Sequence, residues 1–197
     1  MPAREGRKGR PLDAVALRDL ALSYVARFAT TGAKLEGYLA RKVRERGVIE
    51  DEDGRVAELD IRGLVEDFVQ RGYIDDEAYA HARSRDLIQR GYGPRRISEA
   101  LWAAGIEEGA RSEAAPGEAQ ARAAAVLFAR KRRLGPFAVS LEQEPPDSEA
   151  RFRLREKRVA AMLRAGHDHA HARFILDADS EAQLEQWISE APDDIGN

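Results

Sequence analysis

Four clusters of basic residues are the side chains in this sequence with the most evident chemical use. Guanidinium and ammonium groups bind phosphates and carboxylates, and arginine often does so through two parallel hydrogen bonds. A single cluster is better explained as a solvated face balanced by nearby acids, but four together favour contact with an extended polyanion or a filament groove. The candidates are Arg41, Lys42, Arg44, Arg46, Arg95, Arg96, Arg130, Lys131, Arg132, Arg133, Arg151, Arg153, Arg155, Lys157 and the adjoining Arg158.

Two smaller groups could be interpreted as catalytic or metal-binding, and both have a simpler explanation. Asp75 and Asp76 could form an acid–base pair, but helix capping accounts for both. His167 and His171 would share a helix face, but a third ligand is missing and Asp168 between them is a suitable N-cap. The sequence has no Cys, and it contains no P-loop, nucleophile elbow or dinucleotide fingerprint. We therefore expect no enzyme activity, no metal site and no cofactor.

The basic residues must be positioned by helices, and the clearest helical pattern lies between residues 61 and 106. Ile61, Leu64 and Phe68 fall on one helix face, as expected for a core-facing helix. Gly72 should end this helix, because glycine adopts the left-handed C-terminal cap without steric cost. Tyr73 or the next residue should then fold back onto the last turn. We predict structural roles for Gly72, Tyr73, Asp75, Asp76, Tyr79, Gly91, Tyr92, Gly93 and Pro94.

The composition of the chain predicts an all-α fold. Of its 197 residues, 43% are hydrophobic, 34% charged and 7% aromatic, and Ala, Leu, Arg and Glu dominate. These four residue types favour helices, and the low aromatic content suggests many thin amphipathic helices instead of one large globule. The segment 137–141 is the only stretch that we consider as a strand.

The net charge of −3 conceals an asymmetry along the chain. Seven of the 35 acidic residues lie in 177–197, which has no basic residue, so residues 1–176 carry 32 basic and 28 acidic side chains. A mildly basic body fits a protein that meets nucleic acid or an anionic assembly. No apolar run approaches the roughly 20 residues of a membrane span, and no signal-peptide core is present. We expect a cytoplasmic monomer that does not bind membranes.

The helical patterns group in threes, which predicts tandem repeats. The frame Leu39-x3-Val43-x3-Gly47 recurs in two later helices that end at Gly72 and Gly105. Each three-helix unit would cover an apolar face of its neighbour, giving an elongated, curved array. Later helices are expected at 75–90, 94–104, 117–133, 147–165, 168–177 and 180–190, with a loop at 107–117. The predicted division is a disordered basic arm at 1–12, repeats at 13–72 and 73–134, a linker at 135–146, a third repeat at 147–190 and an acidic tail at 191–197.

Two motifs in the central stretch have a specific resemblance. They are Gly72-Tyr73-Ile74-Asp75-Asp76-Glu77-Ala78-Tyr79-Ala80 and Arg90-Gly91-Tyr92-Gly93-Pro94-Arg95-Arg96-Ile97. With these motifs the chain closely resembles the RecX family of recombinase regulators, over about residues 13–176. His167 departs from the family pattern, because an aromatic residue usually follows the late glycine. We expect this change to weaken the cap contact of the third repeat.

The resemblance implies tandem three-helix repeats that lie in the helical groove of a RecA filament on DNA. It also implies a protein that restrains the ATP hydrolysis, strand exchange and co-protease action of RecA without catalysis of its own. The basic clusters then become candidates for contact with RecA or, weakly, with single- and double-stranded DNA. Two other hypotheses remain open. One is an autonomous helix-turn-helix DNA-binding regulator with a basic helix in the major groove, and the other is an inert helical scaffold.

Overall fold

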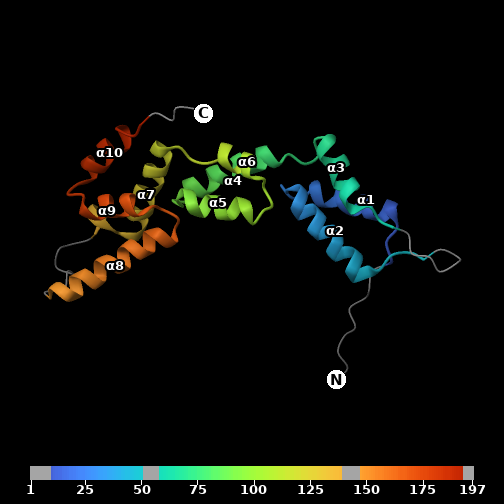
Figure 1. The fold of residues 1–197 in the computed structure, drawn as a ribbon, viewed down its shortest axis with the longest axis horizontal. Coiled ribbons are helices and arrows are strands. Elements are labelled where there is room, and N and C mark those ends of the chain that lie inside the picture. Colours follow the sequence, from blue (N-terminus) through green and yellow to red (C-terminus); the bar gives the residue numbers. More distant parts are fainter. Residues whose placement is uncertain (1–9, 51–57, 139–146, 193–197) are drawn as a thin grey trace, which may run out of the picture. The chain divides into compact units, whose positions relative to one another are not determined.

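The computed structural model describes residues 10–50, 58–138 and 147–192, and within these ranges the chain is all-α (Figure 1). The chain divides into two compact units, residues 1–79 with 104–106 and residues 80–103 with 107–197, and each is described by itself. The helices are α1 (Ala14–Val25), α2 (Gly32–Arg46), α3 (Ile61–Gln70), α4 (Asp76–Gln89), α5 (Pro94–Trp102), α6 (Glu108–Glu113), α7 (Glu118–Arg132), the 3-10 helix η1 (Gly135–Phe137), α8 (Ser148–Arg164), α9 (His169–Asp177) and α10 (Glu181–Ser189).

The first unit is built from α1, α2 and α3 around one apolar core. Phe68, which the helical periodicity placed on a core-facing stripe, is fully buried together with Leu35 and Leu39. Burial of such side chains removes apolar surface from water and supplies most of the stabilisation of the unit. Ile74 is buried and the Tyr73 ring lies 5.3 Å from the Phe68 ring, so the predicted fold-back after Gly72 is confirmed.

Leu12 also belongs to this core, which corrects the prediction of a disordered arm over residues 1–12. Its side chain is 1% exposed. Its backbone N–H donates to the Gly47 carbonyl (2.9 Å), and its own carbonyl accepts from the Ile49 N–H (3.0 Å). A leucine beside an open apolar core gains by burial, and the paired backbone groups remove the cost of burying them. Residues 1–9 of the predicted arm lie outside the described residues.

The N-terminus of α2 is held by side chains from distant parts of the sequence. The Thr31 hydroxyl accepts from the Lys34 N–H (3.2 Å) and donates to the Ala104 carbonyl (2.6 Å). Asp76 Oδ1 accepts from the Gly32 N–H (3.0 Å). These bonds satisfy backbone N–H groups that a helix leaves without partners in its first turn.

The two adjacent aspartates therefore cap two different helices. Asp75 Oδ1 accepts from the Ala78 N–H (2.8 Å) and caps α4, as the sequence predicted, whereas Asp76 caps α2. Tyr79 contacts the same helix end, since its hydroxyl accepts a hydrogen bond from the Lys34 ammonium, which also lies 4.5 Å from the centre of the tyrosine ring. The acidic pair is thus occupied in fixing helix ends.

In the second unit, α7 supplies a face of small side chains on which α8, α9 and α10 pack. Ala121, Ala125 and Ala129 on α7 are at most 3% exposed, and small residues allow neighbouring helices to approach closely. Their partners in the core include Met162 and Ile175, both fully buried. This core groups α7 with the C-terminal helices, whereas the sequence analysis grouped 117–133 with the second trio.

The loop between α4 and α5 lies backbone to backbone against the loop between α8 and α9. The Gly93 N–H donates to the Ala165 carbonyl (2.9 Å), and the Arg95 N–H donates to the Gly166 carbonyl (3.2 Å). A Cβ atom at Gly93 would lie 2.4 Å from the Gly166 carbonyl carbon, so only glycine fits there. Gly166 itself has φ +94°, a left-handed conformation that other residues rarely adopt.

His167 is part of this contact, and the expectation that it weakens the cap is wrong. Its side chain is 2% exposed, and the Nε2–H group donates to the Gly91 carbonyl (3.1 Å). Its backbone N–H donates to the Met162 carbonyl (3.2 Å) and closes the end of α8. Burial lowers the pKa of His167 below its ordinary value, because the imidazolium form loses hydration. A neutral imidazole therefore fills the aromatic position and adds a hydrogen bond.

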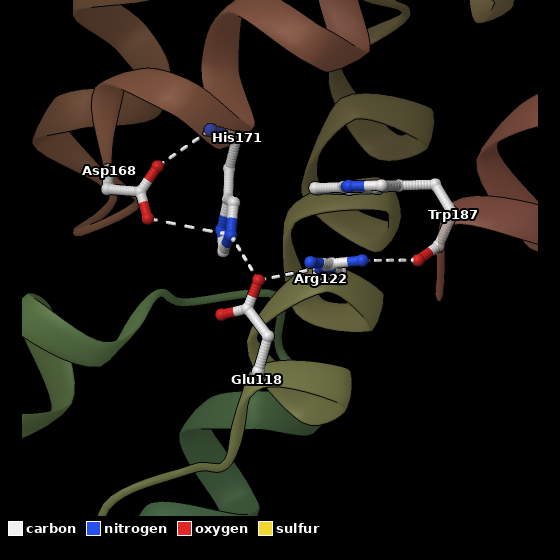
Figure 2. Close-up of polar contacts among 5 residues, drawn as sticks. All are labelled: Glu118, Arg122, Asp168, His171 and Trp187. Carbon is white, nitrogen blue, oxygen red and sulfur yellow. Dashed lines mark hydrogen bonds and ion pairs between the residues drawn. The ribbon is translucent and has the colours of Figure 1, made fainter. Parts of the chain in front are cut away.

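A second polar network joins α7, α9 and α10 (Figure 2). Glu118 Oε1 accepts from Arg122 Nε (2.6 Å) and from His171 Nε2 (3.1 Å). Arg122 also donates to the Trp187 carbonyl (2.7 Å), with its guanidinium 4.9 Å from the centre of the indole. Asp168 Oδ1 accepts from the His171 N–H (2.6 Å) and caps α9 as predicted. Burial acts to raise the pKa of Glu118, but the bonds from Arg122 and His171 outweigh it and lower that pKa.

The remaining differences from the sequence analysis are local. The expected loop at 107–117 contains α6, whose following residue Ala114 is 4% exposed. The Gly and Ala content suggested a loop, but alanine favours helix and one buried residue is enough to anchor a short one. Trp102 is 70% exposed, whereas Trp187 packs against Phe174 (ring centres 4.5 Å apart).

Replacing Gly93 by Ala should lower the free energy of unfolding by about 2–3 kcal/mol, because the added methyl group forces two backbones apart. Chemical denaturation followed by tryptophan fluorescence measures the change. Gly109→Ala is the matched control, since a Cβ there meets nothing within 4 Å. It should stabilise the chain by about 0.5–1 kcal/mol. Equal effects of the two substitutions would contradict the close approach.

The Glu118→Gln variant should lose about 1–2 kcal/mol at pH 7, because an amide accepts weaker hydrogen bonds from Arg122 and His171 than a carboxylate does. The pKa of Glu118 is lowered in the folded chain. Its stabilisation is therefore present above the ordinary value of 4.5 and is lost as the pH falls through the lower, folded value. The difference between variant and wild type, measured by urea denaturation at pH 7 and pH 4, should shrink at pH 4. A pH-independent difference would show that the charge of Glu118 has no part in it.

Candidate functional site

The basic residues of the first unit lie on the outer side of α2. Arg41 and Lys42 both pair with Glu45 (3.7 and 2.6 Å), and their charged groups lie within 6 Å of the Tyr38 ring. Arg44 and Arg46 occupy the last turn of the helix, where positive charge interacts favourably with the helix dipole. These exposed ion pairs are worth little energetically and can be exchanged for contacts with a partner.

Arg95 and Arg96 open α5, and both pair with Glu99 (4.0 and 3.3 Å). The Arg95 guanidinium also donates to the Leu163 carbonyl, so this side chain helps to hold the two glycine loops together. Arg96 has no bond of that kind among the described residues. We therefore regard Arg95 as structural in part and Arg96 as the more available cation.

Several predicted candidates on α7 and α8 are engaged in ion pairs with acids. Arg130 pairs with Glu181 (2.9 Å). Arg153 pairs with Glu149, the residue one turn earlier on α8. Arg155 makes a two-bond contact with Asp177, whose pKa is lowered by this hydrogen bonding. Lys131 instead donates to the Arg90 carbonyl (3.2 Å). Each of these cations has a partner within the fold, although the ion pairs of Arg130 and Arg153 are as exposed as that of Arg41 on α2.

The structure brings other members of the clusters together in one groove of about 960 Å³, which we call the basic groove. It lies between the C-terminal end of α7, η1 and α8, all in the second unit. Its apolar lining includes Phe128, Leu154 and Leu176. The basic residues that line it are Arg132, Arg133, Lys157, Arg158 and Arg164, and Asp179 is its one acidic lining residue among those described.

Of these groove residues, the sequence analysis did not single out Arg164. A signal was available, because Arg164 follows Lys157 by seven residues and therefore lies on the same face of a helix. The same spacing relates Arg158 to Arg151. Helical spacing thus identifies the cations that share a face of α8. The sequence analysis instead grouped basic residues by their closeness in the sequence, so Lys157 and Arg158 were placed in one cluster with Arg153 and Arg155.

The histidines are not arranged as a metal site. His167 contacts the Gly91 carbonyl, whereas His171 contacts Glu118 and lies 3.5 Å from Asp168. Within the described ranges, no group of three or more His, Asp or Glu side chains is placed to hold a metal ion. In the same ranges, no helix is both long and apolar enough to cross a membrane.

Comparisons with known proteins agree with the helical architecture. The family model for the second three-helix domain of RecX matches residues 75–114, which contain α4, α5 and α6. A crystal structure of RecX from Lactobacillus salivarius has a TM-score of 0.61 at 18% identity and covers 88% of this chain and 97% of its own. A second crystal structure of regulatory protein RecX has a TM-score of 0.55 at 19% identity, over 86% of this chain and 80% of its own. At these identities the two structures establish the fold.

A relative with higher identity establishes the family. The regulatory protein RecX of Myxococcus xanthus (strain DK1622) is 30% identical over 178 residues, which are 89% of this chain and 91% of the relative. The match therefore extends over both units and beyond the central motifs. Together with the three-helix architecture, it shows that the chain belongs to the RecX family of regulatory proteins.

Proposed function

We propose that this chain is a non-enzymatic regulator that binds the groove of the RecA–DNA filament and restrains RecA's ATP hydrolysis, strand exchange and co-protease activity. The observation that carries the proposal is the match to a regulatory protein RecX over 89% of the chain. The partners are the RecA filament and, more weakly, single- and double-stranded DNA, and the chain acts as a monomer in the cytoplasm.

The positions of the ionisable groups support a binding role. Asp75, Asp76 and Asp168 cap helices, while Glu118 and His171 share the network that joins α7 to α9. Side chains that could otherwise exchange protons with a substrate are thus used to fix the fold. The exposed cations of α2 and of the basic groove are the groups that remain available to a partner.

The alternative, an autonomous helix-turn-helix regulator, would place a basic helix in the major groove of DNA. α5 is the natural candidate, but Arg95 is tied to Leu163 and both N-terminal arginines pair with Glu99. Sequence-selective DNA binding that is tight without RecA would favour this alternative.

Purified protein should slow the single-stranded-DNA-dependent ATP hydrolysis of RecA at equimolar or lower concentration. The steady-state rate of RecA is measured while this chain is titrated in, at fixed DNA and salt. The expected result is a rate that falls as the chain is added. An unchanged rate over the whole titration would reject the proposed function.

Removing two charges from α2, in the variant Arg41→Gln and Arg44→Gln, should raise the concentration needed for half-inhibition of RecA about fivefold, since two rim ion pairs are worth roughly 0.5 kcal/mol each. The matched control is Arg62→Gln with Arg85→Gln, which removes the same net charge from exposed positions outside the candidate clusters. The control should inhibit like wild type. If both variants lose inhibition equally, only net charge matters and α2 is not a contact surface.

A further inference from the structure

The basic groove gathers in one hollow five cations without ion-pair partners among the described residues. Arg132, Arg133, Lys157, Arg158 and Arg164 make no ion pair with any other residue in the described part of the chain. Like charges gathered in a hollow with apolar walls repel one another and raise the local positive potential. Such an arrangement is unfavourable without a ligand and becomes favourable when an anion enters.

The backbone of Arg133 points to the same conclusion. This residue has φ +55° and ψ 51°, the left-handed conformation at the end of α7, and it is the one residue other than glycine in the described ranges with positive φ. The backbone alone would favour glycine at this position. An arginine there, lining the groove, is consistent with a use for its side chain.

The groove continues along α8 into a smaller hollow of about 220 Å³. Leu154, Arg158 and Leu176 line both, and Arg151 and Phe152 extend the smaller one toward the start of the helix. From Arg164 to Arg151 the helix rises about 20 Å, a length over which one strand presents several phosphates. The cations thus follow a track, with a charge about every two helical turns.

Aromatic and apolar side chains alternate with the cations along this track. Tyr92 and Phe128 line the large groove, and Phe152, which lines the small one, is 63% exposed. A duplex presents phosphates but hides the faces of its bases, so it gains little from such side chains. A single strand gains from both, because its bases stack on aromatic rings while cations contact its phosphates.

We propose that this track, from Arg164 to Arg151 along α8 with Arg132 and Arg133 on its other wall, binds single-stranded nucleic acid. The cations contact the phosphodiester backbone, and Phe152 and Tyr92 stack on bases. The inference rests on the proposed function for the source of the strand, which is a filament that carries DNA. The argument that the track binds a single strand depends only on the residues of the groove.

The test compares the full-length protein with two triple variants in binding to a fluorescent oligothymidylate, measured by anisotropy over a range of salt concentrations. The groove variant is Arg132→Gln, Arg158→Gln and Arg164→Gln. The control, Arg62→Gln, Arg85→Gln and Arg173→Gln, removes the same charge from exposed positions that do not line the groove.

The groove variant should bind at least tenfold more weakly. The slope of log affinity against log salt should fall by about 2, since each lost single-strand phosphate contact contributes roughly 0.7. The control should change affinity less than twofold.

Two further variants separate charge from stacking and from misfolding. Phe152→Ala should lower affinity about fivefold or more while leaving the salt slope unchanged, because a base–ring contact releases no counterions. Arginine-to-lysine changes at the three groove positions should keep most of the affinity. Urea denaturation checks that each variant folds like wild type, and the phenylalanine variant gives an independent test if the triple glutamine variant does not.

The outcomes that would overturn the inference are distinct. Equal losses in the groove and control variants would show that only net charge matters. A preference for duplex over single strand, or full competition by ATP or inorganic polyphosphate at equal phosphate concentration, would assign the groove to another phosphate ligand. The RecA ATPase assay is run with the same variants. Inhibition by wild type combined with unchanged oligonucleotide binding by the groove variant rejects this inference and leaves the proposed function standing. No inhibition by wild type combined with weakened oligonucleotide binding by the groove variant rejects only the proposed function.

Discussion

Left-handed glycines at the ends of helices are the constraint on which this structure depends. Gly47, Gly72, Gly91, Gly105 and Gly166 have φ between +73° and +94°. Each stops a helix and turns the chain within one residue, so that the next apolar side chain returns to the core. Short helices bury little surface alone, and they are stable here because these turns let them pack at once on their neighbours. At Gly93 and Gly166 the same residue type also allows two loops to meet backbone to backbone.

A fold built from many short helices also explains the polar residues of the family motifs. Each helix leaves N–H groups without partners in its first turn, so a chain of many helices needs many caps. Thr31, Asp75, Asp76 and Asp168 supply them, in part across large sequence separations. Acidic residues are thereby used inside the fold, and further acids pair with Arg130, Arg153 and Arg155. The cations left over are the ones that can act on a partner.

The extent to which the sequence predicted the structure depended on the range of the interaction concerned. Helix stripes, glycine caps and the N-cap roles of Asp75 and Asp168 are set within a few residues and were predicted correctly. The boundaries proposed for the three repeats, and the roles of the basic clusters, stay predictions.

Contacts between residues far apart in the sequence were harder to predict. The capping of α2 by Asp76 joins residues 44 positions apart, and no local pattern distinguishes it from the capping of α4. The alanine face of α7 indicates close packing but does not identify its partners, which the structure shows to be the C-terminal helices. The basic groove exists because α7 ends beside α8, so its membership became visible only when the helices were placed. Among the described residues, Arg153 and Arg155 make ion pairs whereas Lys157 does not, although the three lie within five residues of the sequence.

If the proposed groove binds nucleic acid, charge contacts of this kind would suit binding that does not depend on base sequence. Phosphate contacts position a protein without reading bases, and stacking on a phenylalanine is similarly tolerant of sequence. The net charge of −3 comes from the seven acids of residues 177–197, whereas residues 1–176 carry four more basic than acidic side chains. A polyanion is therefore attracted most where cations of this basic part lack acidic partners. Weak, salt-dependent binding at one groove then adds little affinity for free DNA. It becomes effective when a protein contact elsewhere holds the chain beside a strand, because the second contact is then intramolecular and benefits from a high effective concentration.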